Sequence, residues 1–560
     1  MPLNMLTTVS RIYRETADEY LAALPANQPR PKPEDIELDI INALTLKVAA
    51  LNDELPRGCK QRYPLTMPPY IIARIVAALW PVCKIPLAGA ETDPAYDVLG
   101  IYQESGPNEG IYMTSELAFQ RLMKRFNTAA TSRDFSEFMS NLSQIAERKL
   151  PCQDRDLIAV NNGIFDYSTK QLRPFDPGLV FLSKSRVSYV ANPTNPVIHN
   201  PDDGTDWDVE TWMAELSDDP EIVNLLWQVL GAIIRPNVNW DKAAFFYSAS
   251  GNNGKGTLCA LMRNLCGPGT YASTSLADFG KEFLLEPLMR ASAIIVDEND
   301  VGDFKEKCAN FKAIITNDVI QINRKYEKAL AFQFHGFMVQ CVNELPRMKD
   351  KSESLYRRLL FVPFEKCFTG KERKYIKADY LARPEVLEYV LFRILNTNYY
   401  ELSNPTACQN LMADVKQNND PLRQFIDEFF PQFTWDMVPL QFLYDLYVAW
   451  FKRYHTGGYA LGKQTFNTSI ANLQSEIPGW TCVLPKKPGD GTRPDKSMKR
   501  PEPLIVEYNL DNWANKSGLY AYNDPRRAVP ALKQKYGGYF LRTSPAPASV
   551  AISPYGSKTA

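Results

Sequence analysis

The chain has 560 residues, of which 45% are hydrophobic and 23% are charged, and its formal net charge is -1. This composition is typical of globular proteins, and the length accommodates roughly three or four domains of usual size. A chain so close to neutrality is not a generally basic nucleic-acid binder. Any contact with nucleic acid must therefore come from local basic patches.

The cysteines and histidines argue against the common metal and disulfide frameworks. Ten cysteines occur without a C-x-x-C pair, and there are three histidines. This pattern predicts reduced thiols and no zinc site. The most apolar window, 70–89, is interrupted by Arg74, Pro81 and Lys84, so it predicts a buried helix and not a membrane span. No signal peptide is visible at the N-terminus. We expect a soluble, cytoplasmic protein without a membrane partner.

The first part of the chain, residues 1–100, is predicted to be a helical region, because apolar residues recur at helical spacing over 38–51. Residues 101–205 are predicted to form a mixed α/β domain. Within it, the charged and proline-free segment 119–145 favours a helix. Over 160–175, two short apolar runs flank an Asn-Gly turn, which predicts a pair of strands.

Residues 206–240 have the pattern of two amphipathic helices, preceded by an acidic segment that we interpret as a linker, 202–206. Pro220 suits the first turn of the second helix, and Asp218 or Asp219 can cap it.

The segment 245–258, Phe-Phe-Tyr-Ser-Ala-Ser-Gly-Asn-Asn-Gly-Lys-Gly-Thr-Leu, is the most informative feature of the chain. An apolar strand, a turn of small residues and a lysine that opens a helix are the layout of a phosphate-binding loop, in which backbone N–H groups and Lys255 face a triphosphate. The match is imperfect, since Ala249 stands at the first glycine position and Gly256 at the hydroxyl position, with Thr257 one residue later. A plain strand-turn-helix is the alternative. The candidate nucleotide-binding residues are Gly251, Asn252, Asn253, Gly254, Lys255, Gly256 and Thr257.

Two further apolar runs end in polar residues that suit nucleotide hydrolysis. The run 291–296 is followed by Asp297, which can hold Mg²⁺ directly or through water, and by Glu298, which can orient the attacking water. The run 335–342 ends at Asn343, whose amide can contact a γ-phosphate or that water. The alternatives are a strand before an acidic turn and a strand before an Asn turn.

An arginine pair, Arg357 and Arg358, precedes another apolar run at 359–362. Either arginine can act on the nucleotide of a neighbouring subunit as an arginine finger, and Arg358 is our first choice. The alternative is an ordinary surface pair that forms salt bridges.

Taken together and in this order, the four motifs resemble those of the superfamily 3 helicases, most closely the phage and plasmid primase-helicase branch related to the poxvirus primase-helicase. The segments 311–318 and 323–326 look like the extra motif of that branch, and 160–175 looks like the signature of the domain that precedes its motor. The resemblance implies an AAA+-like parallel-sheet ATPase core at 241–370 and a helical collar at 206–240. It also implies ATP and Mg²⁺ as cofactors, with the metal at Asp297 and Thr257.

The same resemblance implies a hexameric ring that moves 3′→5′ along single-stranded DNA. A hairpin tip projects into the central channel of such rings, so Lys325, with Arg324 or Tyr326 beside it, would grip the strand. A cation holds a phosphate and an aromatic ring offers a stacking face, which fits this role. A basic tripeptide is by itself equally compatible with a solvated turn.

After a helical connector at 371–418, residues 419–515 predict a winged helix-turn-helix DNA-binding domain, followed by a flexible tail at 516–560. Its expected elements are helices at 422–430, 439–454 and 462–477 and strands at 480–484 and 504–508. The third helix would enter the major groove, and the basic loop between the strands would touch phosphates. A protein-binding winged helix and a disordered charged loop are the alternatives. The candidate DNA contacts are Lys463, Lys486, Lys487, Lys496, Lys499 and Arg500.

The sequence thus predicts an α/β multidomain protein with a helical or mixed N-terminal region, an AAA+-like core and a C-terminal winged helix. We expect an ATP-dependent replicative DNA helicase of a phage, plasmid or other mobile element. It would work in a bacterial host cytoplasm on single-stranded and forked DNA and load itself at a double-stranded origin. Two alternatives stay open: an origin-binding ATPase that melts or marks DNA and recruits a host helicase, and a DNA-independent oligomeric ATPase scaffold. No paired-Asp strand motif of a polymerising primase is visible, and 154–156 is interpreted as a turn.

Overall fold

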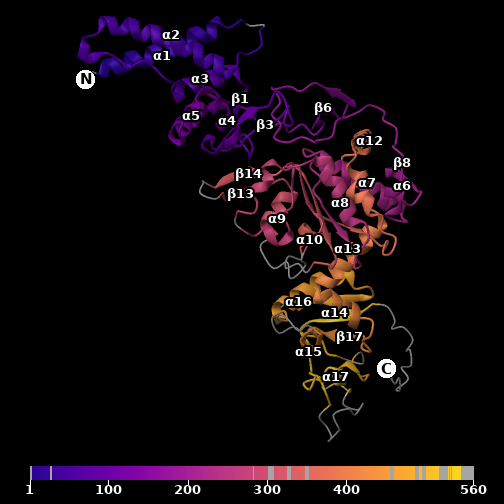
Figure 1. Ribbon diagram of the computed structural model, residues 1–560. Helices are drawn as coiled ribbons and strands as arrows, with labels where there is room; N and C mark the ends of the chain where they lie inside the picture. The colour runs from indigo at the N-terminus through magenta and orange to yellow at the C-terminus, as the bar shows by residue number, and fades with distance from the viewer. Residues whose placement is uncertain are drawn as a thin grey trace. The chain divides into compact units, whose positions relative to one another are not determined.

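The chain forms two compact units, Met1–Ala413 and Asp414–Ala560 (Figure 1). The boundary lies close to the predicted one at 419. The structure, a computed structural model, describes residues 3–25, 28–281, 283–299, 308–324, 329–346, 352–454, 460–485, 491–494, 498, 500–515, 528, 530 and 532–543. Within these ranges, no helix is long and apolar enough to cross a membrane.

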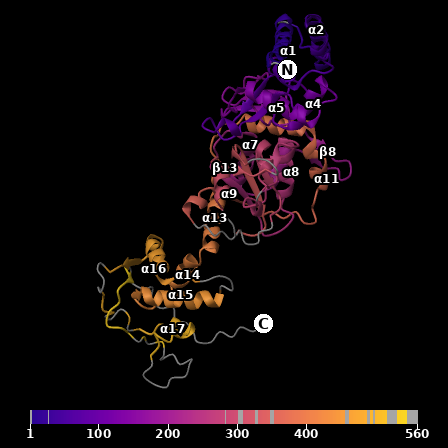
Figure 2. The ribbon, with the colours of Figure 1, turned by 90° about the vertical axis from the view of Figure 1, so that its left-hand side faces the viewer.

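The first unit begins with helices that pack on a small mixed sheet, in the order β3-β2-β1-β4. Figure 2 shows α1 and α2 side by side. The elements are α1 (Leu3–Ala23), α2 (Pro33–Glu54), α3 (Pro69–Leu79), β1 (Val82–Ile85), β2 (Val98–Tyr102), β3 (Tyr112–Met113), α4 (Glu116–Phe126), α5 (Ser132–Ile145) and β4 (Glu147–Arg148). The helix over 38–51 is confirmed, because Ile40, Leu44 and Val48 recur on the buried face of α2. The helical region is shorter than predicted, since β1 and most of β2 lie before residue 101. The helix expected over 119–145 is two helices, and a capping box of Thr131 and Asp134 starts the second.

The predicted strand pair over 160–175 is confirmed as an antiparallel sheet, in the order β5-β6-β7. The helix pair after it is also confirmed, and the side chain of Asp219 accepts from the backbone N–H of Glu221 at 2.8 Å. The expected linker, 202–206, is mostly the turn of a short hairpin. The elements are β5 (Leu157–Val160), β6 (Gly163–Asp166), β7 (Gln171–Arg173), β8 (Ile198–His199), β9 (Asp206–Trp207), α6 (Val209–Glu215) and α7 (Pro220–Ile234).

The centre of the first unit is a five-stranded sheet, in the order β11-β12-β15-β10-β16, in which every pairing is parallel. Its strands are β10 (Ala243–Tyr247), β11 (Tyr271–Ala272), β12 (Ala293–Val296), β15 (Phe337–Val342) and β16 (Leu359–Pro363), and the helix α8 (Lys255–Cys266) follows β10. Neighbouring side chains of β10 face opposite sides: the ring of Phe245 lies 6.3 Å from that of Phe311 in α9 (Cys308–Ile315), whereas Phe246 belongs to the core that contains Leu258 and Leu261 of α8. Helices therefore cover both faces, as a buried parallel sheet requires.

The remaining elements of this unit are β13 (Val319–Ile322), β14 (Leu330–Gln333), α10 (Glu353–Tyr356), α11 (Lys374–Ala378), α12 (Pro384–Leu395) and α13 (Thr406–Asn419), which runs past the unit boundary. β13 and β14 form an antiparallel hairpin.

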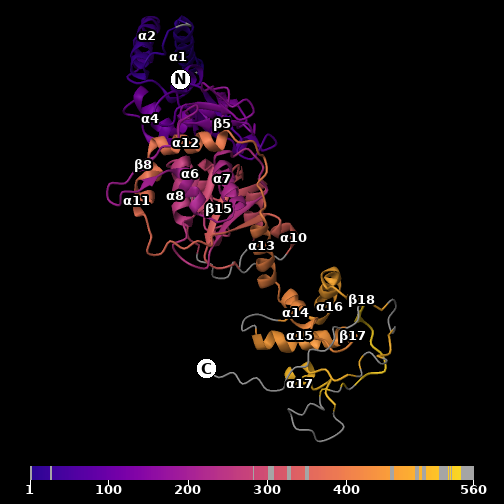
Figure 3. The same ribbon diagram turned by 90° about the vertical axis from the view of Figure 1, so that its right-hand side faces the viewer.

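Within its described residues, the second unit has four α-helices and a three-stranded antiparallel sheet in the order β17-β19-β18 (Figure 3). Its elements are α14 (Pro421–Phe429), β17 (Met437–Pro439), α15 (Leu440–Tyr454), α16 (Lys463–Asn472), β18 (Trp480–Val483), α17 (Leu504–Glu507) and β19 (Tyr539–Arg542). The three predicted helices and the first strand are confirmed. The second predicted strand, 504–508, is wrong: Pro503 precedes a short helix there, and Leu504 and Ile505 are buried in the core of the unit. The partner of β18 is instead β19, so the expectation of a flexible tail is wrong at 539–542, where Phe540 is fully buried.

A fully buried arginine joins distant parts of the first unit. Arg235, at the end of α7, lies 3.6 Å from the ring centre of Tyr167, 4.9 Å from that of Tyr400 and 5.3 Å from that of Trp240. Its Nη1 donates to the backbone carbonyl of Tyr399 at 2.7 Å. Since a cation that has lost its water depends on such rings and carbonyls, Arg235 fixes α7 against the segment that follows α12.

We expect Arg235→Ala to lower the unfolding free energy of the first unit by about 3 kcal/mol, because it removes the cation and leaves a cavity among the rings. Urea unfolding followed by tryptophan fluorescence measures this change. Arg133→Ala, which removes an exposed arginine from α5, is the matched control and should change the midpoint little. Equal midpoints for the two variants would contradict this role of Arg235.

Candidate functional site

The predicted phosphate loop lies between the carboxyl end of β10 and the first turn of α8. Gly254 has a φ of 88° and accepts hydrogen bonds from the N–H groups of Thr257 and Leu258 at 3.1 and 2.9 Å. A Cβ atom on Gly254 would meet Cδ2 of Leu216 at 2.7 Å, so both the backbone angle and the space favour glycine here. Asn252 also has a positive φ, 53°. The strand, turn and helix predicted for 245–258 are confirmed.

Lys255 and Asn343 are brought together, as the sequence suggests. Lys255 is 5% exposed, and its Nζ donates to Oδ1 of Asn343 at 2.8 Å and to the carbonyls of Val342 and Ser248 at 3.3 and 3.4 Å. Burial lowers the pKa of Lys255. The ammonium is thus held by oxygen atoms at the edge of the sheet where the loop begins.

Asp297 directly follows β12, and its carboxylate is paired with an arginine that the sequence reasoning did not identify. Nη1 and Nη2 of Arg263 donate to its two oxygens at 3.1 and 2.8 Å. The hydrogen bond and charge of Arg263 lower the pKa of Asp297. Arg263 lies about two turns beyond Lys255 on α8, so helical spacing from the phosphate loop was a usable signal. Glu298 follows Asp297 and is exposed.

The residues expected to hold Mg²⁺ offer one carboxylate and one hydroxyl, and both oxygens of the carboxylate accept hydrogen bonds from Arg263. Mg²⁺ usually keeps several waters and takes one or two carboxylates together with substrate phosphates. Asp297 supplies one carboxylate, and the hydroxyl-bearing Thr257 is half-buried in the first turn of α8.

The arginine pair lies at the amino ends of the strands, at the opposite end of the sheet from the phosphate loop. The N–H of Ala243, the first residue of β10, donates to the carbonyl of Arg358 at 2.8 Å, and Nη1 of Arg358 donates to Oγ of Ser354 at 2.6 Å. The five residues of β10 span about 16 Å. Arg357 is exposed at the same end of the sheet. Neither arginine is therefore brought to the phosphate loop of its own chain.

A cavity of about 300 Å³ adjoins the phosphate loop. The N–H of Phe368 donates to the carbonyl of Asn252 at 2.7 Å, and Nδ2 of Asn252 donates to Glu372 at 3.2 Å and to Thr369 at 3.3 Å. The segment after β16 is thus fixed to the loop, and it forms one wall of the cavity. The residues that the cavity touches include Thr257, Trp212, Leu216, Phe368, Arg373 and Lys377.

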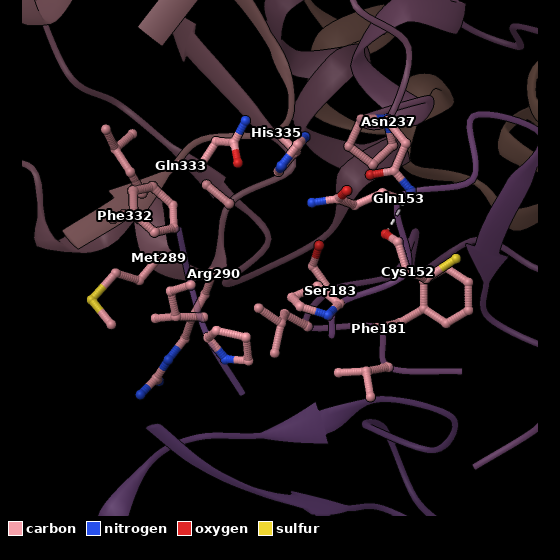
Figure 4. Close-up of a pocket in the computed structure, with 18 of the residues that line it drawn as sticks. Cys152, Gln153, Phe181, Ser183, Asn237, Met289, Arg290, Phe332, Gln333 and His335 are labelled. Carbon is pink, nitrogen blue, oxygen red and sulfur yellow. Dashed lines mark hydrogen bonds between the residues drawn. The ribbon is translucent and has the colours of Figure 1, made fainter. Parts of the chain in front are cut away.

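A second, smaller cavity of about 90 Å³ lies at the amino ends of the strands (Figure 4). Its polar lining includes Gln153, Asn237 and His335, and Nδ2 of Asn237 donates to the carbonyl of Cys152 at 3.1 Å. Burial lowers the pKa of His335. Because His335 precedes β15, this cavity is remote from the phosphate loop.

The predicted channel residues are only partly within the described ranges. Arg324 is half-buried just after β13, whereas Lys325 and Tyr326 lie outside the described residues.

The predicted DNA contacts of the second unit are also only partly within the described ranges. Lys463 opens α16, and its Nζ donates to Gln441. The carbonyl of Arg500 accepts a hydrogen bond from Nε1 of Trp435 at 2.8 Å. The residues outside the described ranges are Lys486, Lys487, Lys496 and Lys499.

Three family models match the chain. Residues 81–224 match "D5 N terminal like", residues 417–501 match "Poxvirus D5 protein-like", and residues 246–358 match a family of unknown function, DUF5906. The first two confirm the predicted resemblance to the D5-related branch. No curated protein matches the sequence.

The chain is also similar to solved structures of the NrS-1 C-terminal region. One apo structure, of residues 305–718, is 13% identical to this chain with a TM-score of 0.43. The alignment covers 75% of this chain and 97% of that chain. An A-form apo structure has 11% identity and a TM-score of 0.42 and covers 85% and 99%. At these scores the similarity carries no further argument.

The Arg263–Asp297 pair should be measurable in the protein without nucleotide. We expect Arg263→Gln and Asp297→Asn to be non-additive, with a coupling energy of about 1 kcal/mol, because the pair is bidentate but partly exposed to water. Thermal or urea unfolding of the wild type, the two single variants and the double variant gives this energy. Strict additivity would contradict the ion pair.

Proposed function

We propose that the chain, which matches two D5-related family models over 81–224 and 417–501, is an ATP-dependent DNA helicase of replication. The family relationship supports a replication protein of the helicase type. The observation that carries the ATP-dependent part is the contact of the buried Lys255 ammonium with Asn343 at the end of the neighbouring strand. A cation and an amide in this position can contact the terminal phosphate of a nucleotide from two sides.

ATP would bind with its phosphates over the start of α8, where the N–H groups of the loop and the helix dipole favour negative charge. Lys255 would exchange its contacts with protein oxygens for contacts with phosphate oxygens. Asp297 and Thr257 would hold Mg²⁺, which would supply positive charge beside the phosphates. Glu298 would accept a proton from the attacking water, and Asn343 would orient that water or the γ-phosphate.

The strand order supports an AAA+-type motor of superfamily 3. The strand before the phosphate loop lies between the strand that ends in Asn343 and the strand that follows Arg358. Because Arg358 lies at the amino ends of the strands, away from the phosphate loop of its own chain, it could contact only the nucleotide of a neighbouring subunit. We therefore propose a ring, with a hexamer as its expected size, in which Arg358 stabilises the transition state of the next subunit and Arg357 is the second choice.

The hairpin of β13 and β14 supports the proposed grip on DNA. Its strands are paired over four residues on each side, so a contact at its tip would follow movements of the core. Lys325, Arg324 and Tyr326 are the proposed contacts with single-stranded DNA, and 3′→5′ movement is the proposed direction.

The helix order of the second unit supports a winged-helix-type module that binds duplex DNA at an origin and so loads the ring. Lys463, at the start of the third helix, is the proposed groove contact, and Arg500 and the lysines at 486, 487, 496 and 499 are the proposed phosphate contacts. Deletion of the whole basic loop would be a poor test, since Met498 is fully buried. We place the protein in the bacterial host cytoplasm, in the service of a phage, plasmid or other mobile element.

Strand displacement on DNA forks tests the motor. With ATP and Mg²⁺, the wild type should unwind a fork with a 3′ tail and not one with a 5′ tail, and Lys255→Ala should unwind neither, because the buried cation is lost. The same Lys255→Ala protein should still bind duplex DNA through its second unit. ATP hydrolysis without unwinding of either fork would reject the helicase and favour an origin-binding ATPase that recruits a host helicase.

A mixing experiment tests the proposed action of Arg358 between subunits. Lys255→Ala and Arg358→Ala should each be inactive in ATP hydrolysis, but their mixture should regain part of the activity, because some interfaces would combine an intact Lys255 with an intact Arg358. Mixing each variant with itself is the control. An inactive mixture of subunits that are known to exchange would reject the proposed action of Arg358 between subunits.

A further inference from the structure

The helix α11 brings a second lysine to the phosphate loop. If Gly256 had a Cβ atom, this atom would lie 3.6 Å from Nζ of Lys377. Gly256 directly follows Lys255 and stands where the standard motif has Ser or Thr. The Lys377 ammonium therefore lies over the first turn of α8, in the space toward which a hydroxyl at position 256 would extend.

The charge of Lys377 acts on the same side of the loop as the carboxylate of Asp297. The pKa of Asp297 is lowered first by its hydrogen bond with Arg263, and the positive charge of Lys377 lowers it further. Such an effect requires proximity. Lys377 thus adds positive charge where the phosphates of a nucleotide would lie.

Two neighbouring cations on this segment form ion pairs, whereas Lys371 and Lys374 line the same cavity as Lys377. Arg373 pairs with Glu215, and Lys366 pairs with Asp218. Within the described part of the chain, no carboxylate lies within ion-pair distance of Lys377. Its ammonium faces the cavity of about 300 Å³ beside Gly254 and Thr257, so a bound anion could reach it.

The position of α11 is set by contacts on both of its sides. Before it, the N–H of Phe368 is bonded to the carbonyl of Asn252 in the phosphate loop. After it, Nδ2 of Asn264 on α8 donates to the carbonyl of Leu381 at 2.9 Å. Within it, Ile376 is 3% exposed and belongs to the core. The lysine is therefore carried by a fixed helix and not by a free surface loop.

We propose that Lys377 is a second phosphate-binding cation of the nucleotide site, and that its ammonium lies beside the position that Gly256 leaves without a side chain. This inference rests on the proposed nucleotide binding and adds a residue to that site. Lys255 would donate to phosphate oxygens from within the loop, and Lys377 would donate from α11. Each contact is a charge-assisted hydrogen bond.

The affinity for the slowly hydrolysed analogue ATPγS, measured with Mg²⁺ by calorimetry, tests the inference. Lys377→Ala should weaken binding about tenfold, the size expected for the loss of one charge-assisted hydrogen bond. Lys377→Arg should keep most of the affinity. Arg383→Ala, which removes a half-buried cation that is paired with Asp379 and is absent from the cavity lining, is the control and should bind like the wild type.

Gly256→Ser provides a second, independent variant. A serine hydroxyl would compete for the Lys377 ammonium, so this change should weaken ATPγS binding in the wild type and have a smaller effect in Lys377→Ala. Additive effects of the two changes would count against a shared space. The melting temperature without nucleotide should be the same for Lys377→Ala and the wild type, because the side chain is exposed.

The outcomes separate this inference from the function on which it rests. If the wild type binds no ATPγS, the proposed function fails, and the role of Lys377 fails with it. If the wild type binds, Lys255→Ala does not, and Lys377→Ala binds like the wild type, the nucleotide site stands and the inference about Lys377 is overturned.

Discussion

The parallel pairing of β10 with β15 on one side and β16 on the other is the constraint on which the site depends. Tyr247 is in register with Val342 and with Pro363, so three strands end together. The residues that follow these three strands lie at the carboxyl ends of the sheet. Ser248 begins the phosphate loop there, the side chain of Asn343 contacts Lys255, and the segment from Phe364 leads to Phe368 and Lys377. The same register places Arg358 beside Ala243 at the amino ends of the strands. The register of these strands therefore determines that Lys255, Asn343 and Lys377 lie near one site and that Arg358 lies away from it.

The phosphate loop is shaped as much by its neighbours as by its own residues. Leu216 of α6 leaves no room for a side chain at Gly254, and the ring of Phe368 lies on the same side. Asn252 bonds to the segment after β16 through both its backbone and its side chain. Residues far before and far after the motif thus hold the backbone conformation of the loop. This explains how the loop can depart from the standard sequence at 249 and 256 and still form the turn into α8.

Much of this site was accessible from the sequence, because its signals are local. A strand, a turn of small residues and Lys255 are contiguous, and Asn343 directly follows an apolar run. Arg263 and Lys377 were missed for different reasons. Arg263 lies on the same helix as Lys255, so its spacing was visible, but its partner Asp297 becomes apparent only when β12 is placed beside α8. Lys377 lies on a short helix more than a hundred residues beyond Gly256, and only the fold brings the two together.

In the second unit, the sequence identified the helices but misplaced a strand, and the reason is burial. The run Leu504-Ile505-Val506 is apolar, and two of its residues are β-branched, which favours a strand, yet Pro503 and core packing give a helical turn. The strand that completes the sheet, β19, comes after a long polar stretch that gives no signal for pairing. At the C-terminal end of the predicted basic loop, the described residues Arg500 and Glu502 contact the core of the unit. Buried Glu502 accepts hydrogen bonds from the N–H and hydroxyl of Thr434, both at 2.9 Å, so the C-terminal end of the loop is fixed to the core. At its other end, the loop follows β18, which is paired with β19.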